Sequence, residues 1–331
     1  MIDPTALPKA ELHLHIEGTF EPEQIFEFAA RNGVRLKYPS VEALRDAYKF
    51  TDLQSFLDLY YEAMSALRTE RDFEELTLAY LRRARMQNVK HAEIFFDPQA
   101  HTGRGIAFET VLDGLWSALQ RSERDFGITT KLIMCFLRDQ PRESAMQTLE
   151  TAAPFADRIA GVGLDSAEAG NPPSKFAAVY DRARALGFHA VAHAGEEGPP
   201  AYIREALDIL HVERIDHGVR ILEDPELVQR VARERIPLTL CPFSNVRLRV
   251  VKTLAEHPLK RMLDAGLLCT VNSDDPAYFG GYVADNYAGA AQALHLSDTD
   301  VVALARNSFE ASFLAPAEKA AYVESLLSVA G

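Results

Sequence analysis

Short apolar runs alternate with longer amphipathic stretches along most of the chain. Eight of these runs have the length and the β-branched, aromatic and aliphatic content of buried strands. They cover residues 11–17, 89–96, 132–137, 159–166, 188–193, 214–219, 237–241 and 267–271. Stretches with helical periodicity lie between the runs, so the pattern predicts parallel strands joined by helices.

Two helical regions stand out. One lies between the first two predicted strands and is longer than such a connection needs, and the other ends the sequence. Glu21-Pro22-Glu23 is expected to open a first helix that runs through Arg31, and residues 41–87 are then expected to form a helical insertion. Within it, residues 55–66 carry apolar side chains at helical spacing, and such an insertion is a natural wall or lid over a site. Residues 283–329 predict terminal helices.

Eight alternating strand and helix units indicate a (β/α)8 TIM barrel in one domain that spans residues 1–331. The alternative, an open doubly wound sheet, carries a Gly-x-Gly-x-x-Gly fingerprint after its first strand when it binds a nucleotide. No such fingerprint follows residues 11–17. In the expected barrel, active sites lie where the carboxyl ends of the strands meet.

Composition narrows the classes of function. The formal net charge is −13, which argues against nucleic acid or an anionic membrane surface as the partner. The sequence shows neither a run of 18 apolar residues nor the pattern of a signal peptide. Three cysteines without Cys-x-x-Cys spacing argue against a disulfide framework and a thiolate zinc cage. A cytoplasmic enzyme or binding protein is expected, and its oligomeric state stays open.

Candidate metal ligands lie at three predicted strand ends. His13 and His15 are two residues apart, so their side chains share one face of a strand. Such a pair also occurs by chance. However, His193 ends the fifth predicted strand, and Asp274 ends the eighth, which neighbours the first in a closed barrel. Imidazoles with a carboxylate suit one Zn²⁺ ion per chain, and Fe²⁺ or Mn²⁺ also fits this set.

Glu196, His217 and Asp275 are the candidates for chemistry beside the metal. Glu196 becomes a general acid or base if partial burial raises its pKa. His217 is placed to orient or deprotonate the attacking water. Its alternatives are a fourth ligand and a hydrogen-bonded core histidine. Asp275 faces differently from Asp274 and is expected to meet the substrate, although the two aspartates also suit a plain turn.

Other notable residues are interpreted as structural. Six histidines lack an acidic constellation at the right strand end and are expected in the core or on the surface: His91, His101, His189, His211, His257 and His295. Lys9 and Arg220 are expected to be solvated or paired. Phe56, Tyr60 and Tyr61 either pack the insertion or form a wall for a planar ligand, and packing is the preferred interpretation.

Four motifs carry these residues: residues 8–18 (PKAELHLHIEG), 193–196 (HAGE), 214–218 (RIDHG) and 273–276 (SDDP). In this order they resemble the adenosine/adenine deaminase branch of the metal-dependent amidohydrolases, and the resemblance spans about residues 7–325. It implies the barrel fold and one catalytic zinc. By position it assigns the ligands His13, His15, His193 and Asp274, the proton donor Glu196, the catalytic histidine His217 and the substrate contact Asp275.

Within this branch, the sequence is more similar to members that act on a free purine base than to members that act on a nucleoside. Glu17 stands where the nucleoside enzymes usually have an aspartate that reaches the ribose, and its longer side chain would crowd that space. Glu168 stands where they usually have a glycine, and its carboxylate would accept a ring N–H of the free base. Gly195 allows the backbone to approach the ligand. All three are expected to contact the substrate.

The resemblance implies hydrolytic deamination of adenine to hypoxanthine and ammonia, as in purine salvage. Two alternatives keep the chemistry but change the substrate to adenosine or to an N6-substituted adenine such as a cytokinin-type base. A third is a non-catalytic purine-binding protein on the same barrel. Amidohydrolases of cyclic amides or phosphoesters usually need a carboxylated lysine or a second metal, and no lysine ends the fourth predicted strand.

Overall fold

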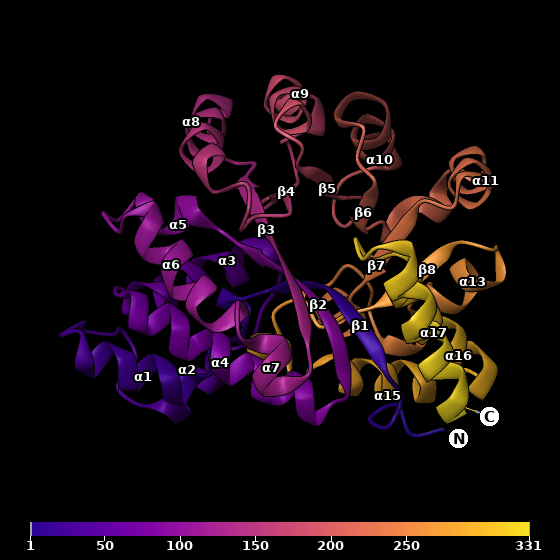
Figure 1. Ribbon diagram of the computed structural model, residues 1–331, viewed down its shortest axis with the longest axis horizontal. Helices are drawn as coiled ribbons and strands as arrows, with labels where there is room; N and C mark the ends of the chain where they lie inside the picture. The colour runs from indigo at the N-terminus through magenta and orange to yellow at the C-terminus, as the bar shows by residue number, and fades with distance from the viewer. Residues whose placement is uncertain (1, 331) are drawn as a thin grey trace.

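The computed structural model describes residues 2–330, and its eight strands form one parallel sheet in chain order (Figure 1). The strands are β1 (Lys9–His15), β2 (Val89–Phe96), β3 (Thr129–Leu137), β4 (Gly161–Asp165), β5 (His189–Ala194), β6 (Arg214–His217), β7 (Pro237–Leu240) and β8 (Leu268–Val271). Each pairs in parallel with the next, from β1 through β8. The architecture is the (β/α)8 TIM barrel that the alternating pattern predicts.

The chain after β8 closes the barrel against β1. Leu14 and Asp274 form a parallel bridge. The N–H of His15 donates to the Asp274 carbonyl at 3.0 Å, and the N–H of Asp274 donates to the His13 carbonyl at 3.1 Å. Because these bonds lie at the carboxyl end of β1, the closing seam also brings Asp274 beside both histidines.

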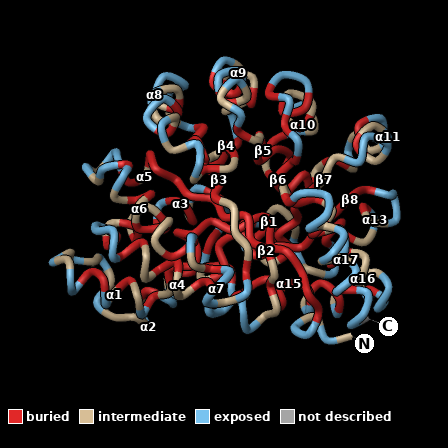
Figure 2. Tube along the Cα trace, viewed as in Figure 1, coloured by how far each residue is buried: buried red, intermediate tan, exposed pale blue. Residues whose placement is uncertain are grey.

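Helices surround the strands, with buried inner faces and exposed outer faces (Figure 2). The crossovers after β2 contain α5 (Pro98–Thr102), α6 (Phe108–Leu119), α7 (Ser122–Phe126), α8 (Arg142–Ala152), α9 (Ala177–Ala185), α10 (Pro200–Glu205), α11 (Pro225–Glu234), α12 (Pro242–Arg247) and α13 (Leu259–Asp264). In α11, for example, Leu227 and Val231 are buried at a spacing of four residues, which gives the helix one apolar face. Within residues 2–330, no helix has both the length and the hydropathy needed to cross a membrane.

Four helices join β1 to β2: α1 (Pro22–Arg31), α2 (Val41–Asp46), α3 (Leu53–Ala63) and α4 (Glu70–Met86). Helix α3 begins with a capping box formed by Asp52 and Ser55, and it buries Phe56 and Tyr60. The chain ends with α14 (Pro276–Phe279), α15 (Val283–Ala293), α16 (Asp298–Glu310) and α17 (Pro316–Ala330). Helix α16 packs on β1 and β8, so the terminal helices cover the seam of the barrel.

Four predicted strands, corresponding to β1, β4, β6 and β7, continue past their observed ends. Strand β1 stops at His15, because Glu17 begins a short 3-10 helix. Ser166 and His217 have φ angles of 69° and 64°, and this left-handed conformation ends the extended backbone of β4 and β6. The apolar sequence therefore does not show where these strands end, because the backbone turns at the mouth of the barrel.

The expectation that Lys9 is solvated or charge-paired is wrong. Lys9 is fully buried at the start of β1, where its Nζ donates to the carbonyls of Leu7 at 2.6 Å and Gln87 at 2.5 Å. Burial lowers its pKa to about 7. Arg220, by contrast, is paired with Glu223 at 2.8 Å, as expected.

Candidate active site

Strand β1 supplies two imidazoles to the mouth of the barrel. His13 and His15 are both buried, and their ring centroids lie 5.5 Å apart. The Nδ1 of His13 is 2.9 Å from the hydroxyl of Thr239, and the Nδ1 of His15 is 3.5 Å from a carboxylate oxygen of Asp165. These neighbours fix both rings so that each Nε2 faces Asp274, which is how outer residues orient metal-ligating histidines.

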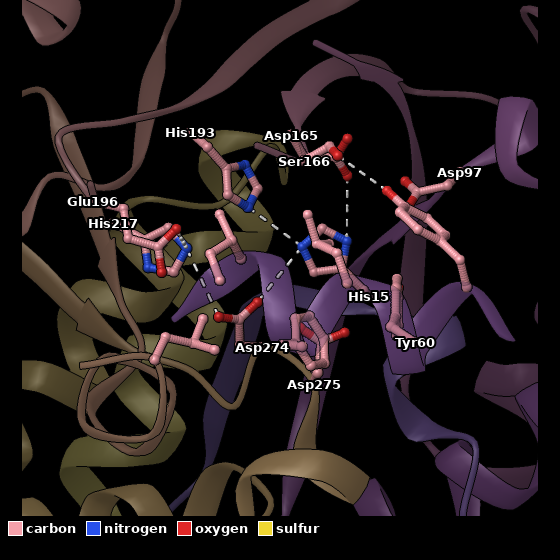
Figure 3. Close-up of a pocket in the computed structure, with 15 residues that line it drawn as sticks. His15, Tyr60, Asp97, Asp165, Ser166, His193, Glu196, His217, Asp274 and Asp275 are labelled. Atoms are coloured by element: carbon pink, nitrogen blue, oxygen red, sulfur yellow. Dashed lines mark hydrogen bonds and ion pairs between the residues drawn. The ribbon is translucent and has the colours of Figure 1, made fainter. Parts of the chain in front are cut away.

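His193 from β5 and Asp274 after β8 complete the cluster (Figure 3). The Nε2 atoms of His15 and His193 are 3.3 Å apart. One carboxylate oxygen of Asp274 lies 3.2 Å from the Nε2 of His13 and 3.5 Å from that of His15. Donor atoms of these four residues therefore lie close to one another, and His15 also forms a second group of possible ligands with Asp97 and Asp165.

This cluster fits a divalent metal. Bonds of about 2.0–2.1 Å in a tetrahedron place ligand atoms roughly 3.3 Å apart, which is close to the observed separations. The buried Nε2 of His13 has no hydrogen-bond partner, as expected of an atom reserved for another bond. Burial lowers the pKa of His15 to about 4 and that of His193 well below its ordinary value, so both rings are neutral and able to bind a cation.

Glu196 and His217 lie beside the cluster. The Nε2 of His217 is 3.6 Å from a Glu196 oxygen and 3.7 Å from the second oxygen of Asp274. Donor atoms of His217, His13, His193 and Asp274 all lie within 4.8 Å of one another, so both sequence-based interpretations of His217, catalyst and ligand, are within reach. Burial raises the pKa of Glu196 well above its ordinary value, and the negative charges of neighbouring carboxylates raise it further. Glu196 therefore suits a general acid near neutral pH.

Left-handed backbone recurs around this cavity. Ser166, His217 and Asp274 follow or end strands, line the cavity and have φ angles of 69°, 64° and 64°. Non-glycine residues adopt this conformation rarely and at an energetic cost, so the surrounding structure must hold them. Three of the eight non-glycine residues with positive φ in residues 2–330 thus lie at this cavity, where the turn sets the direction of each side chain.

The cavity has about 390 Å³ of space between atoms, counted together with the open solvent at its mouth. Helix α3 and the loop after α12 form an apolar wall of Leu53, Phe56, Leu57, Tyr60, Tyr61 and Leu248. Packing was the preferred interpretation of the three aromatic residues, and it is incomplete. The rings do pack against one another, with Phe56 and Tyr60 centroids 4.9 Å apart, but they also line the cavity.

The predicted substrate contacts divide into two groups. Asp275 lines the cavity, and one of its buried oxygens has no hydrogen-bond partner. Burial and the neighbouring Asp274 carboxylate raise its pKa well above the ordinary value. The other three candidates, Glu17, Glu168 and Gly195, are not among the residues that line the cavity.

The structure places these three one layer behind the cavity. Glu17 accepts the Nε2–H of His101 at 2.8 Å and the backbone N–H of Asp97 at 3.1 Å. Glu168 accepts the N–H of Gly195 at 2.7 Å, so this N–H is not available for a ligand. The Glu168 carboxylate and the Gly195 N–H are thus bound to each other, and a contact of either residue with the substrate stays a prediction.

The sequence places Asp165 at a strand end, but it gave no role to the two carboxylates opposite Glu196. Asp97 and Asp165 line the cavity, and each has a buried oxygen without a hydrogen-bond partner. Burial raises the pKa of Asp97 well above its ordinary value and that of Asp165 to about 7. The signal that could have found Asp97 is its position directly after β2, the same strand-end position that marked the other candidates.

Two of the six histidines set aside as structural support the site from behind. His101 holds Glu17, and His257 lies 3.0 Å from Asn245, whose amide is 3.4 Å from His217. His91 is buried deep in the barrel beside Glu93 and Thr129. These residues are structural, as expected, but His101 and His257 also hold residues at or behind the site in position.

Comparisons with known proteins agree with this geometry. The profile of the family described as Adenosine deaminase matches residues 8–329. An adenine deaminase from Streptomyces coelicolor is 67% identical over 308 residues, which cover 93% of this chain and 91% of that protein. An adenine deaminase from Cupriavidus necator is 60% identical over 316 residues, with coverage of 96% and 90%.

Solved structures show the same similarity. The adenine deaminase from Arthrobacter aurescens has a TM-score of 0.96 at 56% identity, covering 97% of this chain and 98% of that one. An amidohydrolase from Burkholderia ambifaria, solved with bound Zn, has a TM-score of 0.90 at 29% identity, with coverage of 98% and 92%.

Proposed function

Because the chain belongs to the adenosine deaminase family, we propose that it catalyses the hydrolytic deamination of adenine to hypoxanthine and ammonia. The relatives from Streptomyces and Cupriavidus are adenine deaminases and match nearly the whole chain. The observation that carries the proposal is the cavity itself, in which a metal-ligand cluster, a neutral carboxylic acid and uncommitted carboxyl oxygens face one small space.

The metal would be zinc, and His13, His15, His193 and Asp274 would hold it. This donor set suits Zn²⁺, and the similar amidohydrolase from Burkholderia was solved with Zn. When bound, the metal lowers the pKa of water and so supplies the nucleophile at neutral pH. His217 and Asp274 orient the attacking water toward C6 of adenine and accept its proton.

Glu196 acts as the acid on the purine. Its raised pKa keeps it protonated, and it donates that proton to N1, which makes C6 electrophilic and offsets the charge of the tetrahedral adduct. The exocyclic amino group then takes a proton and leaves as ammonia. Asp275, whose pKa is also raised, donates a hydrogen bond to N7 from its neutral carboxyl group.

The far wall of the cavity favours a free base over a nucleoside. In the purine ring N9 lies at the opposite end from N1, and Asp97 and Asp165 lie across the cavity from Glu196 (Figure 3). Adenine carries a proton on its imidazole edge that a carboxylate oxygen accepts, whereas adenosine carries ribose there. Glu17 contributes indirectly, since it holds the backbone of Asp97.

A substrate panel with metal content measured on the same sample tests the proposal. Adenine should be deaminated faster than adenosine and than N6-alkyladenine by protein that holds one zinc per chain. Equal or faster adenosine turnover would overturn the choice of substrate. Zinc-loaded protein that releases no ammonia from any aminopurine would instead indicate a purine-binding protein.

A further inference from the structure

Glu168 binds four consecutive backbone N–H groups. Its Oε1 accepts from Gly195 at 2.7 Å, and its Oε2 accepts from Glu196 at 3.0 Å and from Glu197 and Gly198 at 2.8 Å each. The side chain is 1% exposed, so water does not compete for these bonds. Four donors saturate the acceptor capacity of a carboxylate, which has about four lone-pair sites.

These N–H groups belong to the loop that carries the proposed acid. Residues 195–198 follow directly after β5, so one short segment links His193 to Glu196. The loop approaches Glu168 closely, and a Cβ at position 198 would lie 2.5 Å from Glu168 Oε1. Glycine at 198 is therefore required for this contact.

A second buried ion holds the other side of the same loop. The guanidinium of Arg138 donates to the His193 carbonyl at 2.7 Å and to the Asn171 carbonyl at 2.9 Å. Arg138 thus binds the carbonyl that precedes the loop, while Glu168 binds the N–H groups within it. Charge-assisted hydrogen bonds of this kind are stronger than neutral ones, and a loop held by them has little freedom.

No neutral side chain reproduces this arrangement. Glutamine offers one oxygen and places an N–H₂ donor against backbone donors, which repel it. Four converging N–H groups form a nest that favours an anion, and here the protein supplies that anion itself. The function of the carboxylate is therefore tied to its charge and not only to its size.

We propose that Glu168 is a positioning residue that fixes Glu196 against purine N1 by anchoring residues 195–198. The inference rests on the proposed deamination of adenine, and it replaces the expected contact between Glu168 and the substrate. It predicts that loss of the anion lowers the rate of the chemical step while metal binding and substrate affinity stay close to those of the wild type.

The first test compares Glu168→Gln with Glu197→Gln, a neighbouring carboxylate whose side chain makes none of these bonds. We expect kcat per bound zinc to fall about a hundredfold in Glu168→Gln, the effect of misplacing a catalytic group by about 1 Å. KM for adenine should change little, because the metal and the cavity walls remain. Glu197→Gln should match the wild type in both constants.

The second test restores the anion. Glu168→Gly removes the side chain but leaves the four N–H groups, and formate is a carboxylate small enough to occupy the vacated space. Formate should raise kcat of Glu168→Gly in a saturable manner and should leave Glu168→Gln and the wild type unchanged. Chloride at equal ionic strength is the control for a general salt effect.

Two results would overturn the inference. One is wild-type kcat per bound zinc in Glu168→Gln, which would reduce the residue to a purely structural role. The other is a Glu168→Gly protein whose lost activity formate does not restore. If the wild type itself fails to deaminate adenine, the proposed function fails. The position of residues 195–198 in a crystal structure of Glu168→Gln then still decides whether Glu168 anchors the loop.

Discussion

Two groups of buried carboxylates in this barrel differ in whether their oxygens have hydrogen-bond partners. Inside the barrel, Glu11 accepts from Ser273 and from Tyr80 at 2.8 Å, and Glu93 accepts from Arg214 and the N–H of Phe313. At the mouth, Asp97, Asp165, Glu196 and Asp275 each keep a buried oxygen without a hydrogen-bond partner. Unsatisfied buried oxygens destabilise a fold, so their concentration at one place indicates groups kept for a ligand.

Glu93 in the interior and two acids at the mouth also differ in protonation. Burial alone would raise the pKa of Glu93, but the charge of Arg214 lowers it to about 2, so this interior carboxylate is ionised. Glu196 and Asp275 are equally buried and lack a cationic partner, and the pKa of each is raised well above the ordinary value. Glu93 is thus an ion that stabilises the barrel, whereas Glu196 and Asp275 are neutral acids that can donate protons.

Removing the metal should have the largest effect of all, and it should affect the chemistry at the mouth but not the interior. Dialysis against a chelator is expected to abolish ammonia release from adenine, because the nucleophile is lost, and added Zn²⁺ should restore it. The interior ion pairs do not depend on the metal, so the far-UV circular dichroism spectrum should stay unchanged. Turnover that persists in protein without detectable metal would contradict the metal-dependent mechanism.

Glu93→Gln should affect stability and not chemistry. It leaves the buried Arg214 without its ionic partner, and breaking a buried pair in this way costs about 3–5 kcal/mol of unfolding free energy. Urea unfolding at pH 7 measures this loss, with the exposed Glu226→Gln as the control. The rate of deamination per folded molecule should be that of the wild type. A lower rate would show that the interior ion pair also affects the active site.

Acid unfolding offers a second view of the same residue. The pKa of Glu93 is about 2 in the folded protein against 4.5 for the unperturbed group. Its contribution to stability is therefore complete above about pH 4.5 and is lost as the pH falls through about 2. The Glu93→Gln variant should lack this part of the pH dependence.

Glu196→Gln should lower the turnover of adenine by at least about a hundredfold, because the amide cannot donate a proton to N1. Zinc content should be retained, since the proposed ligands are untouched. The adjacent Glu197→Gln, which replaces a half-buried carboxylate, is the matched control. Near-normal turnover in Glu196→Gln would remove this residue from its proposed role.

Asp97→Ala should have the smallest effect and should act on selectivity. Loss of one hydrogen bond to a ring N–H is expected to lower kcat/KM for adenine by about tenfold. Adenosine has no such N–H, so its turnover should not fall, and the preference for adenine over adenosine should narrow. Asp139→Ala, an exposed neighbour, is the control. An unchanged preference would show that Asp97 does not contribute to substrate recognition.

The sequence by itself determined the barrel and most of the metal cluster. Alternating strands and helices leave few ways to bury their apolar faces, and a closed parallel barrel gathers all carboxyl strand ends at one mouth. Once the strand ends are known, His13, His15, His193 and Asp274 must lie near one another. The structure brings these four together, with donor distances of 3.2–3.5 Å.

Only the tertiary structure decided what stands behind these residues. Glu168 follows β4 and was expected in the cavity, yet its carboxylate turns to the loop after β5, where four N–H groups face it. Lys9 is charged in sequence and buried in the barrel. A sequence pattern shows which face of a strand a side chain occupies. It does not show which backbone groups from distant segments meet that side chain, and these groups set its role.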